Sequence, residues 1–524
     1  MSAKKKQKSK SGSKRPPKRS SRRSGKPEPV SREGVEQSLH SQRNGEIRLP
    51  DEELTILCDA IVARHENVLR LRRDAIDSVG ERLGDETPPD PVPWYPLAIH
   101  PPENIARPSR SIDYASGEYY LQDAGSLLAL AAAEADTDQL RGKLICDLCA
   151  APGGKASALL EAIDEPYRPG PDIPPRGFLL ANEPIRSRVA PLAYNLARTG
   201  SDQYAVTSEN PEALADKFPE LFDFVLVDAP CSGQAMMARG KQSPSAVQAS
   251  HIALNADRQN RILTAAERLL RPGGTIVYST CTFAIDENEG QVRFMIEQLG
   301  LNASPMQRLE PFLTELSDCP APDALRCSYR LWPHRNPCAG SFAARLSKPV
   351  STSNDPIDGD VSDHDDPEND RDRIDASWRR STTSRSRDDA MVPRDAVEQL
   401  PFLIRVDDER YRFVLRDWII EGNPPDAPDW VSEPCVFGPE VAHRTGTTWK
   451  PSHAAALRRT SAIADVECIE VDDETALKYL AGETIPATEQ TGWLVVRHRG
   501  RPLGWIKSDG RIGKNHLARF ARLD

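Results

Sequence analysis

The sequence contains no run of about 18 apolar residues, the length that a membrane-spanning helix requires. Its N-terminus also lacks the apolar stretch of a secretory signal peptide. Cysteine is scarce, with ten in 524 residues and no spacing typical of a disulfide framework. These absences exclude a transmembrane helix and argue against a disulfide-rich secreted scaffold. We therefore expect an intracellular protein without a membrane partner.

Four motifs of familiar enzyme classes are missing too: G-x-G-x-x-G, the P-loop, H-E-x-x-H and G-x-S-x-G. The first absence argues against a bound dinucleotide. Cys146 and Cys149 form a C-x-x-C pair, but it runs through a predicted strand, where alternate side chains point to opposite faces. No second pair follows at the spacing of a zinc ribbon, so we expect no bound metal.

Charge is distributed unevenly along the chain, whose formal net charge is −10. Residues 1–27 contain twelve Lys and Arg residues and no acid, whereas the remainder has 56 basic and 78 acidic residues. We expect residues 1–45 to be a disordered basic arm that either keeps the protein soluble or attracts phosphate groups. Residues 349–398 are expected to be an acidic disordered linker, because 355–375 hold ten acidic residues and almost no aliphatic ones.

Hydrophobic patterning divides the rest of the chain into three parts. Residues 46–125 are predicted to be a helical extension, since Leu54, Leu57, Ile61, Val68 and Leu71 recur at roughly helical spacing. Residues 126–348 alternate short β-branched runs with amphipathic segments, which indicates a parallel α/β sheet. Strands are expected at 143–148, 177–182, 204–207, 222–227, 275–279 and 341–346, and helices at 155–163, 185–199, 256–270 and 287–298. Residues 399–524 are predicted to form a small β-rich domain.

The residues after the first two predicted strands indicate a nucleoside pocket. The first strand leads into small residues that open a helix: Cys149, Ala150, Ala151, Pro152, Gly153, Gly154 and Lys155. Small side chains let a ligand approach the backbone, and a helix N-terminus favours polar or anionic groups. Glu183 follows the second strand and suits the hydroxyls of a ribose. Because ligands of open α/β sheets lie at the carboxyl ends of the strands, the loop and Glu183 should face one nucleoside.

Cysteines follow two further predicted strands. Cys231 lies shortly after Asp228, at the end of the fourth strand, and Cys281 follows the fifth. Single cysteines are usually small, buried apolar residues. Two thiols at neighbouring strand ends beside a nucleoside pocket instead favour nucleophilic chemistry.

These motifs, in this order, resemble the Nop/Sun family of RNA (cytosine-5)-methyltransferases. The matching segments are 117–123, the glycine loop, 228–233, 278–282 with 287–289, and 330–334. Beyond the linker, 477–483, 492–493, 503–507 and 514–516 resemble the C-terminal RNA-binding domain of bacterial rRNA members. The resemblance implies a Rossmann-like class I S-adenosylmethionine-dependent methyltransferase domain at 126–348. It also implies an N-terminal RNA-binding extension at 46–125 and a PUA-like domain at 399–524.

The same resemblance implies roles for the site residues. S-adenosylmethionine would be wrapped by residues 149–155, with Glu183 on its ribose and Asn210 near its adenine. Asp228 would line the methyl end and hydrogen-bond the target cytosine near nitrogen 3. Cys281 matches the nucleophile that attacks carbon 6 of the cytosine, and Cys231 matches the residue that assists product release.

Composition independently supports RNA as the partner. Residues 497–522 contain eight Lys and Arg residues and one acid, with Trp505 and Phe520 among them, which suits contact with phosphates and stacked bases. We expect rRNA rather than tRNA as substrate, a monomer, and a cytoplasmic location, or a nucleolar one if the source is eukaryotic. Three other interpretations stay open. One is a tRNA (cytosine-5)-methyltransferase, the second is a DNA (cytosine-5)-methyltransferase, in which Cys231 would attack, and the third is a non-catalytic ribosome-assembly factor.

Overall fold

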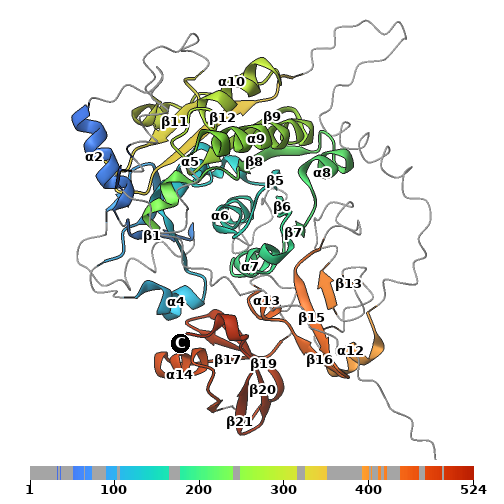
Figure 1. Cartoon of the computed structure of the whole chain (residues 1–524). Helices are drawn as coiled ribbons and strands as arrows, with labels where there is room; N and C mark the ends of the chain where they lie inside the picture. The colour runs from blue at the N-terminus through green and yellow to red at the C-terminus, as the bar shows by residue number, and fades with distance from the viewer. Residues whose placement is uncertain are drawn as a thin grey trace, which may run out of the picture.

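The computed structural model describes residues 32–33, 36, 51–63, 65–73, 90–102, 107–164, 177–239, 248–314, 325–350, 392–400, 403, 411–414, 418–421, 437–458, 466–486 and 489–523. Nearly all of the expected basic arm and most of the expected acidic linker lie outside these residues. Figure 1 shows a large central sheet with helices on both faces, a small N-terminal sheet beside it, and the C-terminal elements below, next to α4 and α7.

The central sheet confirms the α/β prediction, and every expected strand is present. Its parallel strands are β5 (Leu144–Asp147), β6 (Phe178–Asn182), β7 (Tyr204–Thr207), β8 (Phe222–Asp228) and β9 (Leu270–Thr280), in the order β7-β6-β5-β8-β9. Beyond β9 the sheet turns antiparallel, with β12 (Ser341–Ser347) pairing with β9, and β10 (Asn302–Ala303) and β11 (Ser328–Leu331) pairing with β12. The sheet is therefore mixed rather than wholly parallel, in a Rossmann-like arrangement.

Helices bury both faces of this sheet. One face is covered by α5 (Leu128–Ala132), α6 (Gly154–Ile163) and α7 (Arg186–Ala197), and the other by α8 (Pro211–Lys217), α9 (Ala249–Leu269) and α10 (Glu289–Glu297). Ile145 packs into the first core and its neighbour Cys146 into the second, so each parallel strand is apolar on both sides. The helix expected at 256–270 starts earlier, at Ala249, and leads directly into β9.

The N-terminal extension is not the helical domain that was predicted. One helix, α2 (Asp51–Val62), is followed by β1 (Asn67–Leu71), β2 (Pro91–Val92), β3 (Tyr95–Ile99), the short helix α4 (Ile112–Ala115) and β4 (Tyr119–Asp123). These strands form an antiparallel sheet in the order β2-β3-β1-β4. Val68 and Leu71 fit the helical spacing of α2 by coincidence. In the structure they lie on β1, where Val68 and Leu69 enter different cores, as the two-residue period of a strand requires.

The C-terminal part is β-rich, as predicted, and contains two sheets. The first joins β13 (Tyr411–Val414), β14 (Trp418–Glu421), β15 (Glu440–Thr445) and β16 (Thr448–Pro451), with α12 (Arg394–Gln399) and α13 (His453–Ala456) beside it. The second sheet comprises β17 (Cys468–Glu470), β18 (Ile485–Pro486), β19 (Thr491–His498), β20 (Arg501–Asp509) and β21 (Ile512–Asn515). Its strand order is β17-β19-β20-β21-β18. Helix α14 (Asp473–Leu480) packs against it. Helix α12 begins inside the segment expected to be linker, because Val392 and Ala396 are buried against Trp449.

Specific contacts hold the C-terminal part against the central domain. Val206, on the edge strand β7, exchanges two backbone hydrogen bonds of 2.9 Å with Phe437. Arg501 forms a 2.8 Å ion pair with Glu118, which is fully buried. Among the described helices, none is long and apolar enough to cross a membrane.

Candidate active site

Asn182 ties together the carboxyl ends of three parallel strands. Its Nδ2 donates to the carbonyl oxygens of Leu148, after β5, and Glu209, after β7, at 3.2 and 3.1 Å. Its Oδ1 accepts from the Thr207 hydroxyl at 2.8 Å. The side chain is fully buried, so these bonds fix the edge at which the sequence predicts a nucleoside pocket. Sequence reasoning assigned Asn182 no role because its partners come from separate strands.

The glycine loop 149–155 packs closely against α7. Gly153 adopts φ 110°, and a Cβ added there would lie 2.9 Å from Cβ of Asn195. The carbonyl oxygen of Pro152 accepts a 2.7 Å hydrogen bond from Nδ2 of Asn195. Gly154 then begins α6, whose N-terminal N–H groups lie at the loop. Small residues are thus required for packing here as well as for the approach of a ligand.

Glu183 lies beside this loop, as the strand-end argument predicts. Its carboxylate is buried and accepts a 2.9 Å hydrogen bond from the Ile185 N–H. It also forms a 3.1 Å ion pair with Arg188, whose other Nη donates to the Ala151 carbonyl oxygen at 2.6 Å. Arg188 therefore links the acid to the loop. Asn210 lies exposed at the start of α8, next to Glu209, at the end of β7.

Asp147, at the end of β5, is a buried acid that sequence reasoning left without a role. Its Oδ1 accepts from the Cys149 N–H at 3.3 Å, and its Oδ2 is buried without a hydrogen-bond partner among the described residues. Burial raises the pKa of the Asp147 carboxyl to about 8, and the nearby Asp228 adds to the shift. A buried acceptor of this kind fits a ligand that brings an N–H or O–H donor.

Asp228 and Lys155 connect the loop to the cysteine motifs. The Lys155 ammonium lies 2.8 Å from Asp228 Oδ2, and the Ser279 hydroxyl donates to Asp228 Oδ1 at 2.7 Å. Burial disfavours the charge on Lys155, but Asp228 and, more weakly, Cys281 favour it and raise the pKa of the ammonium. A cation thus lies near the thiol of Cys281.

The two predicted thiols meet at this edge. Cys231 Sγ and Cys281 Sγ are 3.5 Å apart, and both side chains are partly exposed. The hydrogen bond to Cys281, together with burial, raises the pKa of the Cys231 thiol. Two further bonds join their loops: the Ala235 N–H donates to the Cys281 carbonyl oxygen at 3.0 Å, and the Ser232 and Thr282 hydroxyls are 2.6 Å apart.

The helix α2 closes one side of the Cys281 loop. Leu54, Leu57 and Ile61 pack with Phe283 and Met237 in one apolar cluster, which Cys281 contacts. Glu53 on the same helix lies within hydrogen-bond distance of His334, at 2.9 Å, and forms an ion pair with Arg335 at 2.6 Å. The N-terminal extension is therefore part of the wall of the site.

The basic C-terminal segment differs from its prediction at one aromatic residue. Trp505 is buried in the core, and its indole N–H donates to the Ser452 carbonyl oxygen at 2.7 Å, so it cannot stack on a base. Phe520 is 67% exposed, with its ring centroid 4.9 Å from that of Tyr194. Six of the eight basic residues are exposed: Arg499, Lys507, Arg511, Lys514, Arg519 and Arg522.

Comparison with known proteins gives one family match over the central domain and one over the last part of the chain. Residues 131–347 match the family described as 16S rRNA methyltransferase RsmB/F, and residues 466–523 match the methyltransferase RsmF PUA domain. The ribosomal RNA small subunit methyltransferase F of Shewanella oneidensis is 26% identical over 443 residues, which cover 82% of this chain and 84% of the relative. Its counterpart in an Enterobacter species is 33% identical over 266 residues, or 49% and 51% of the two chains. A methyltransferase homologue from Pyrococcus horikoshii of known structure is 23% identical, covers 61% of this chain and 100% of that one, and has a TM-score of 0.47.

Proposed function

The chain belongs to the RsmB/F family of 16S rRNA methyltransferases, and we infer that it transfers a methyl group from S-adenosylmethionine to carbon 5 of a cytosine in 16S rRNA. The methyl donor supplies an electrophilic methyl group on a sulfonium when it is bound. The observation that carries the proposal for the site is the 3.5 Å approach of Cys231 and Cys281 beside the Lys155–Asp228 ion pair.

We propose that the glycine loop and its neighbours hold the methyl donor. Oδ2 of Asp147 has no hydrogen-bond partner among the described residues, which supports this, because the methyl donor carries an amino group that a buried carboxylate can accept from. The residues that would hold it are Cys149, Ala150, Ala151, Pro152, Gly153, Gly154 and Lys155, with Glu183 on the ribose, Asn210 near the adenine and Asp228 at the methyl end. The Arg188 ion pair keeps the Glu183 carboxylate at the loop.

Cys281 is proposed as the nucleophile. Carbon 5 of cytosine is a poor nucleophile, but a thiolate added at carbon 6 turns the ring into an enamine that reacts at carbon 5. The Lys155 ammonium, which is ion-paired with Asp228, lies near the Cys281 thiol. Asp228 is proposed to hydrogen-bond the cytosine edge near nitrogen 3, where its carboxylate can accept from that nitrogen once the nitrogen carries a proton, and so stabilise the adduct.

Cys231 is proposed to complete the reaction. After methylation, carbon 5 bears both a methyl group and a proton, and the bond from carbon 6 to Cys281 remains. A base must take the carbon-5 proton, and the electron pair of that C–H bond then forms the ring double bond as the Cys281 thiolate leaves. Cys231 lies close enough to Cys281 to reach the same ring, directly or through one water.

The C-terminal domain is proposed to supply much of the affinity for rRNA. Its exposed Lys and Arg residues can neutralise phosphates, whereas the body of the protein is acidic. We further propose that the protein acts as a monomer in the cytoplasm.

Methyl transfer can be tested with the purified full chain. Labelled S-adenosylmethionine should transfer its label to small-subunit rRNA, and bisulfite sequencing of that RNA should show one new protected cytosine. Label appearing in duplex DNA would support the DNA-type alternative. Label in neither nucleic acid, despite binding of the methyl donor, would support a non-catalytic assembly factor.

A further inference from the structure

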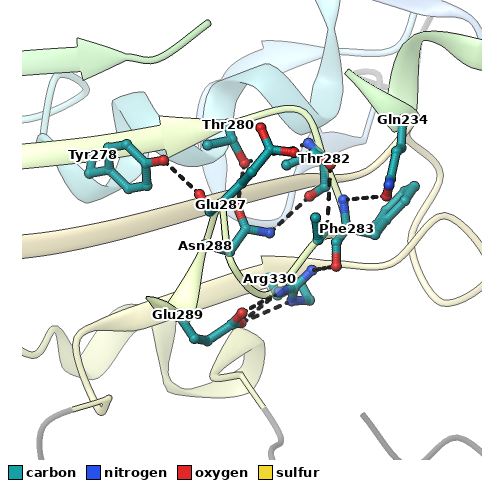
Figure 2. Close-up of polar contacts among 10 residues, drawn as sticks. Gln234, Tyr278, Thr280, Thr282, Phe283, Glu287, Asn288, Glu289 and Arg330 are labelled. Carbon is teal, nitrogen blue, oxygen red and sulfur yellow. Dashed lines mark hydrogen bonds and ion pairs between the residues drawn. The ribbon is translucent and has the colours of Figure 1, made fainter. Parts of the chain in front are cut away.

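Three consecutive polar residues at the start of α10 are completely buried. Glu287, Asn288 and Glu289 each have no exposed surface, although burying an amide and two carboxylates is costly unless each finds a partner. Figure 2 shows that Asn288 points toward Thr280 and Thr282, whereas Glu289 points toward Arg330. The identity of these partners indicates what the three residues do.

Asn288 spans the turn that carries Cys281. Its Oδ1 accepts a 2.5 Å hydrogen bond from the Thr280 hydroxyl, and its Nδ2 donates to the Thr282 carbonyl oxygen at 3.0 Å. Thr280 and Thr282 are the residues immediately before and after Cys281. An amide supplies an acceptor and a donor on one rigid plane, so this side chain fixes both sides of the turn at once.

Glu289 fixes the next residue of the same turn through Arg330. Both Oε atoms of Glu289 bind one Nη of Arg330, at 2.6 and 2.7 Å, and the other Nη donates to the Phe283 carbonyl oxygen at 3.3 Å. The Phe283 N–H in turn donates to Gln234 Oε1 at 3.1 Å. The turn is thereby tied to the segment that follows Cys231.

Glu287 fixes the loop that carries Cys231. Its Oε2 accepts from the Ser232 N–H at 2.9 Å and from Gln259 Nε2 at 3.0 Å. Gln259 also donates to the carbonyl oxygen of Pro230 at 3.1 Å. Pro230 and Ser232 flank Cys231, so Glu287 holds this loop on both sides, as Asn288 holds the loop of Cys281.

A requirement for stability alone would not explain why polar and charged residues occupy these buried positions. A buried ion pair such as Arg330–Glu289 is often no more stabilising than well-packed apolar residues, because both charges lose their hydration. What the polar groups provide is fixed geometry, since each hydrogen bond has a short range of acceptable distances and angles. The cysteine loops lie beyond the strand ends, where the regular pairing of β8 and β9 stops and the backbone bond from Ala235 to Cys281 joins them, so side-chain hydrogen bonds supply much of the remaining geometry.

We propose that residues 287–289 are a positioning element that sets the separation and orientation of the two thiols, with Asn288 as the positioning residue for Cys281. The inference rests on the proposed function, in which Cys281 attacks the cytosine. A thiolate must approach carbon 6 along a narrow direction, so a turn that moves by about 1 Å can slow attack by up to a hundredfold.

The test alters the hydrogen bonds of the turn with little change in volume. Thr280→Val deletes the donor to Asn288, together with the acceptor of a long 3.5 Å bond from the Thr282 N–H. Asn288→Asp replaces the donor to the Thr282 carbonyl oxygen by a second acceptor. Thr280→Ser keeps the hydroxyl and is the matched control. Thr264→Val is a second control, because the exposed Thr264 hydroxyl on α9 donates to the Asn260 carbonyl oxygen of its own helix, far from either cysteine loop in sequence.

Each variant is made in a Cys231→Ala background, and the rate of covalent adduct formation with small-subunit rRNA is measured in a single turnover. We expect Thr280→Val and Asn288→Asp to lower the rate constant at saturating RNA by about tenfold or more, with the RNA concentration for half-maximal rate unchanged. Thr280→Ser and Thr264→Val should retain the parent rate.

A merely structural role predicts a different pattern. The fraction of protein that reacts, and its thermal midpoint, would fall while the rate constant of the reacting fraction stayed at the parent value; that result would overturn the proposal. If neither Thr280→Val nor Asn288→Asp folded, the bonds would be needed for folding, and that result would also overturn the proposal. If the Cys231→Ala parent itself formed no adduct, the assignment of the nucleophile, rather than the positioning element, would be wrong.

Discussion

Cys231 Sγ lies 3.5 Å from Cys281 Sγ, although 50 residues separate the two cysteines along the chain. They meet because each follows one strand of a parallel pair, β8 and β9, in which Asp228 lies opposite Ser279. Parallel strands that pair in register end at the same edge of the sheet. The contact between the thiols is therefore a consequence of topology, and the hydrogen bonds of the two loops refine it.

The glycine loop gives the first prediction. Gly153→Val should abolish binding of S-adenosylmethionine, because a side chain is strained at φ 110° and its Cβ would lie 2.9 Å from Cβ of Asn195. Calorimetry with the methyl donor measures the effect. Gly300→Val is the matched control, since Gly300 also has a positive φ, of 70°, but its Cβ would meet nothing within 4 Å. Full binding by a folded Gly153→Val protein would refute the placement of the pocket.

The second prediction concerns Asp147 in the protein without ligand. The pKa of its carboxyl is about 8 in the folded state, above the ordinary value of about 3.9, so the folded protein holds a proton that the unfolded chain releases. Stability must then fall as pH rises from about 4 to about 8. Asp147→Asn, which stays neutral, should remove this pH dependence and raise the thermal midpoint at pH 8 more than at pH 5.

Asp216→Asn provides the control for this pH dependence, because that carboxylate is exposed in a surface ion pair with Arg268. Its effect on the thermal midpoint should be small at both pH values. If Asp147→Asn were instead less stable than the wild type at pH 8, native contacts would be stabilising the ionised carboxylate.

Strand-end chemistry could be predicted from the sequence, whereas the partners of each side chain could not. Cys231, Cys281 and Glu183 follow apolar runs, and a parallel sheet brings the ends of such runs together whatever the details of packing. The ion pair of Glu289 with Arg330 joins residues 41 positions apart and depends on the antiparallel strand β11, which no pattern predicted. Local periodicity also has limits, since Val68 continued a helical spacing across the end of α2 into β1.

Trp505 illustrates the same limit for surfaces. Basic neighbours in the sequence suggested an exposed aromatic ring, but Trp505 is buried in a core that it shares with residues of the first C-terminal sheet. Lys507, two residues later on the same face of β20, is exposed. Exposure therefore depends on how far along this face of β20 the first C-terminal sheet extends, which the sequence pattern of β20 does not give.

The third prediction concerns the interface with rRNA. Lys507 on β20 and Lys514 on β21 lie directly opposite each other, a like-charge pair that is unfavourable unless an anion lies nearby. Replacing both by Gln should weaken binding of small-subunit rRNA and lower the slope of log affinity against log salt by about 0.7 to 0.9 for each phosphate that the variant no longer neutralises. Arg268→Gln, on α9, should leave the slope unchanged, and an unchanged slope in the double variant would remove this surface from the interface.

The last prediction separates the two thiols. If Cys281 attacks carbon 6, Cys281→Ala forms no covalent bond to RNA and is inactive. If Cys231 assists release, Cys231→Ala still attacks and accepts the methyl group, but the Cys281–cytosine bond then persists. A denaturing gel of each variant with small-subunit rRNA and S-adenosylmethionine should show a slowly migrating protein–RNA band for Cys231→Ala alone.

The pattern of bands is decisive because the alternatives differ in which cysteine variant can give a band. A DNA-type assignment has Cys231 as nucleophile and allows no band from Cys231→Ala; Cys281→Ala would give the band if Cys281 then assists release, and would turn over normally if it does not. Normal turnover in both variants would mean that the thiols are ordinary small residues at a strand edge. Since the two Sγ atoms lie 3.5 Å apart, either thiol is near enough to reach the same ring, and distance cannot distinguish the roles. Only the identity of the trapped cysteine can do so, and we expect it to be Cys281.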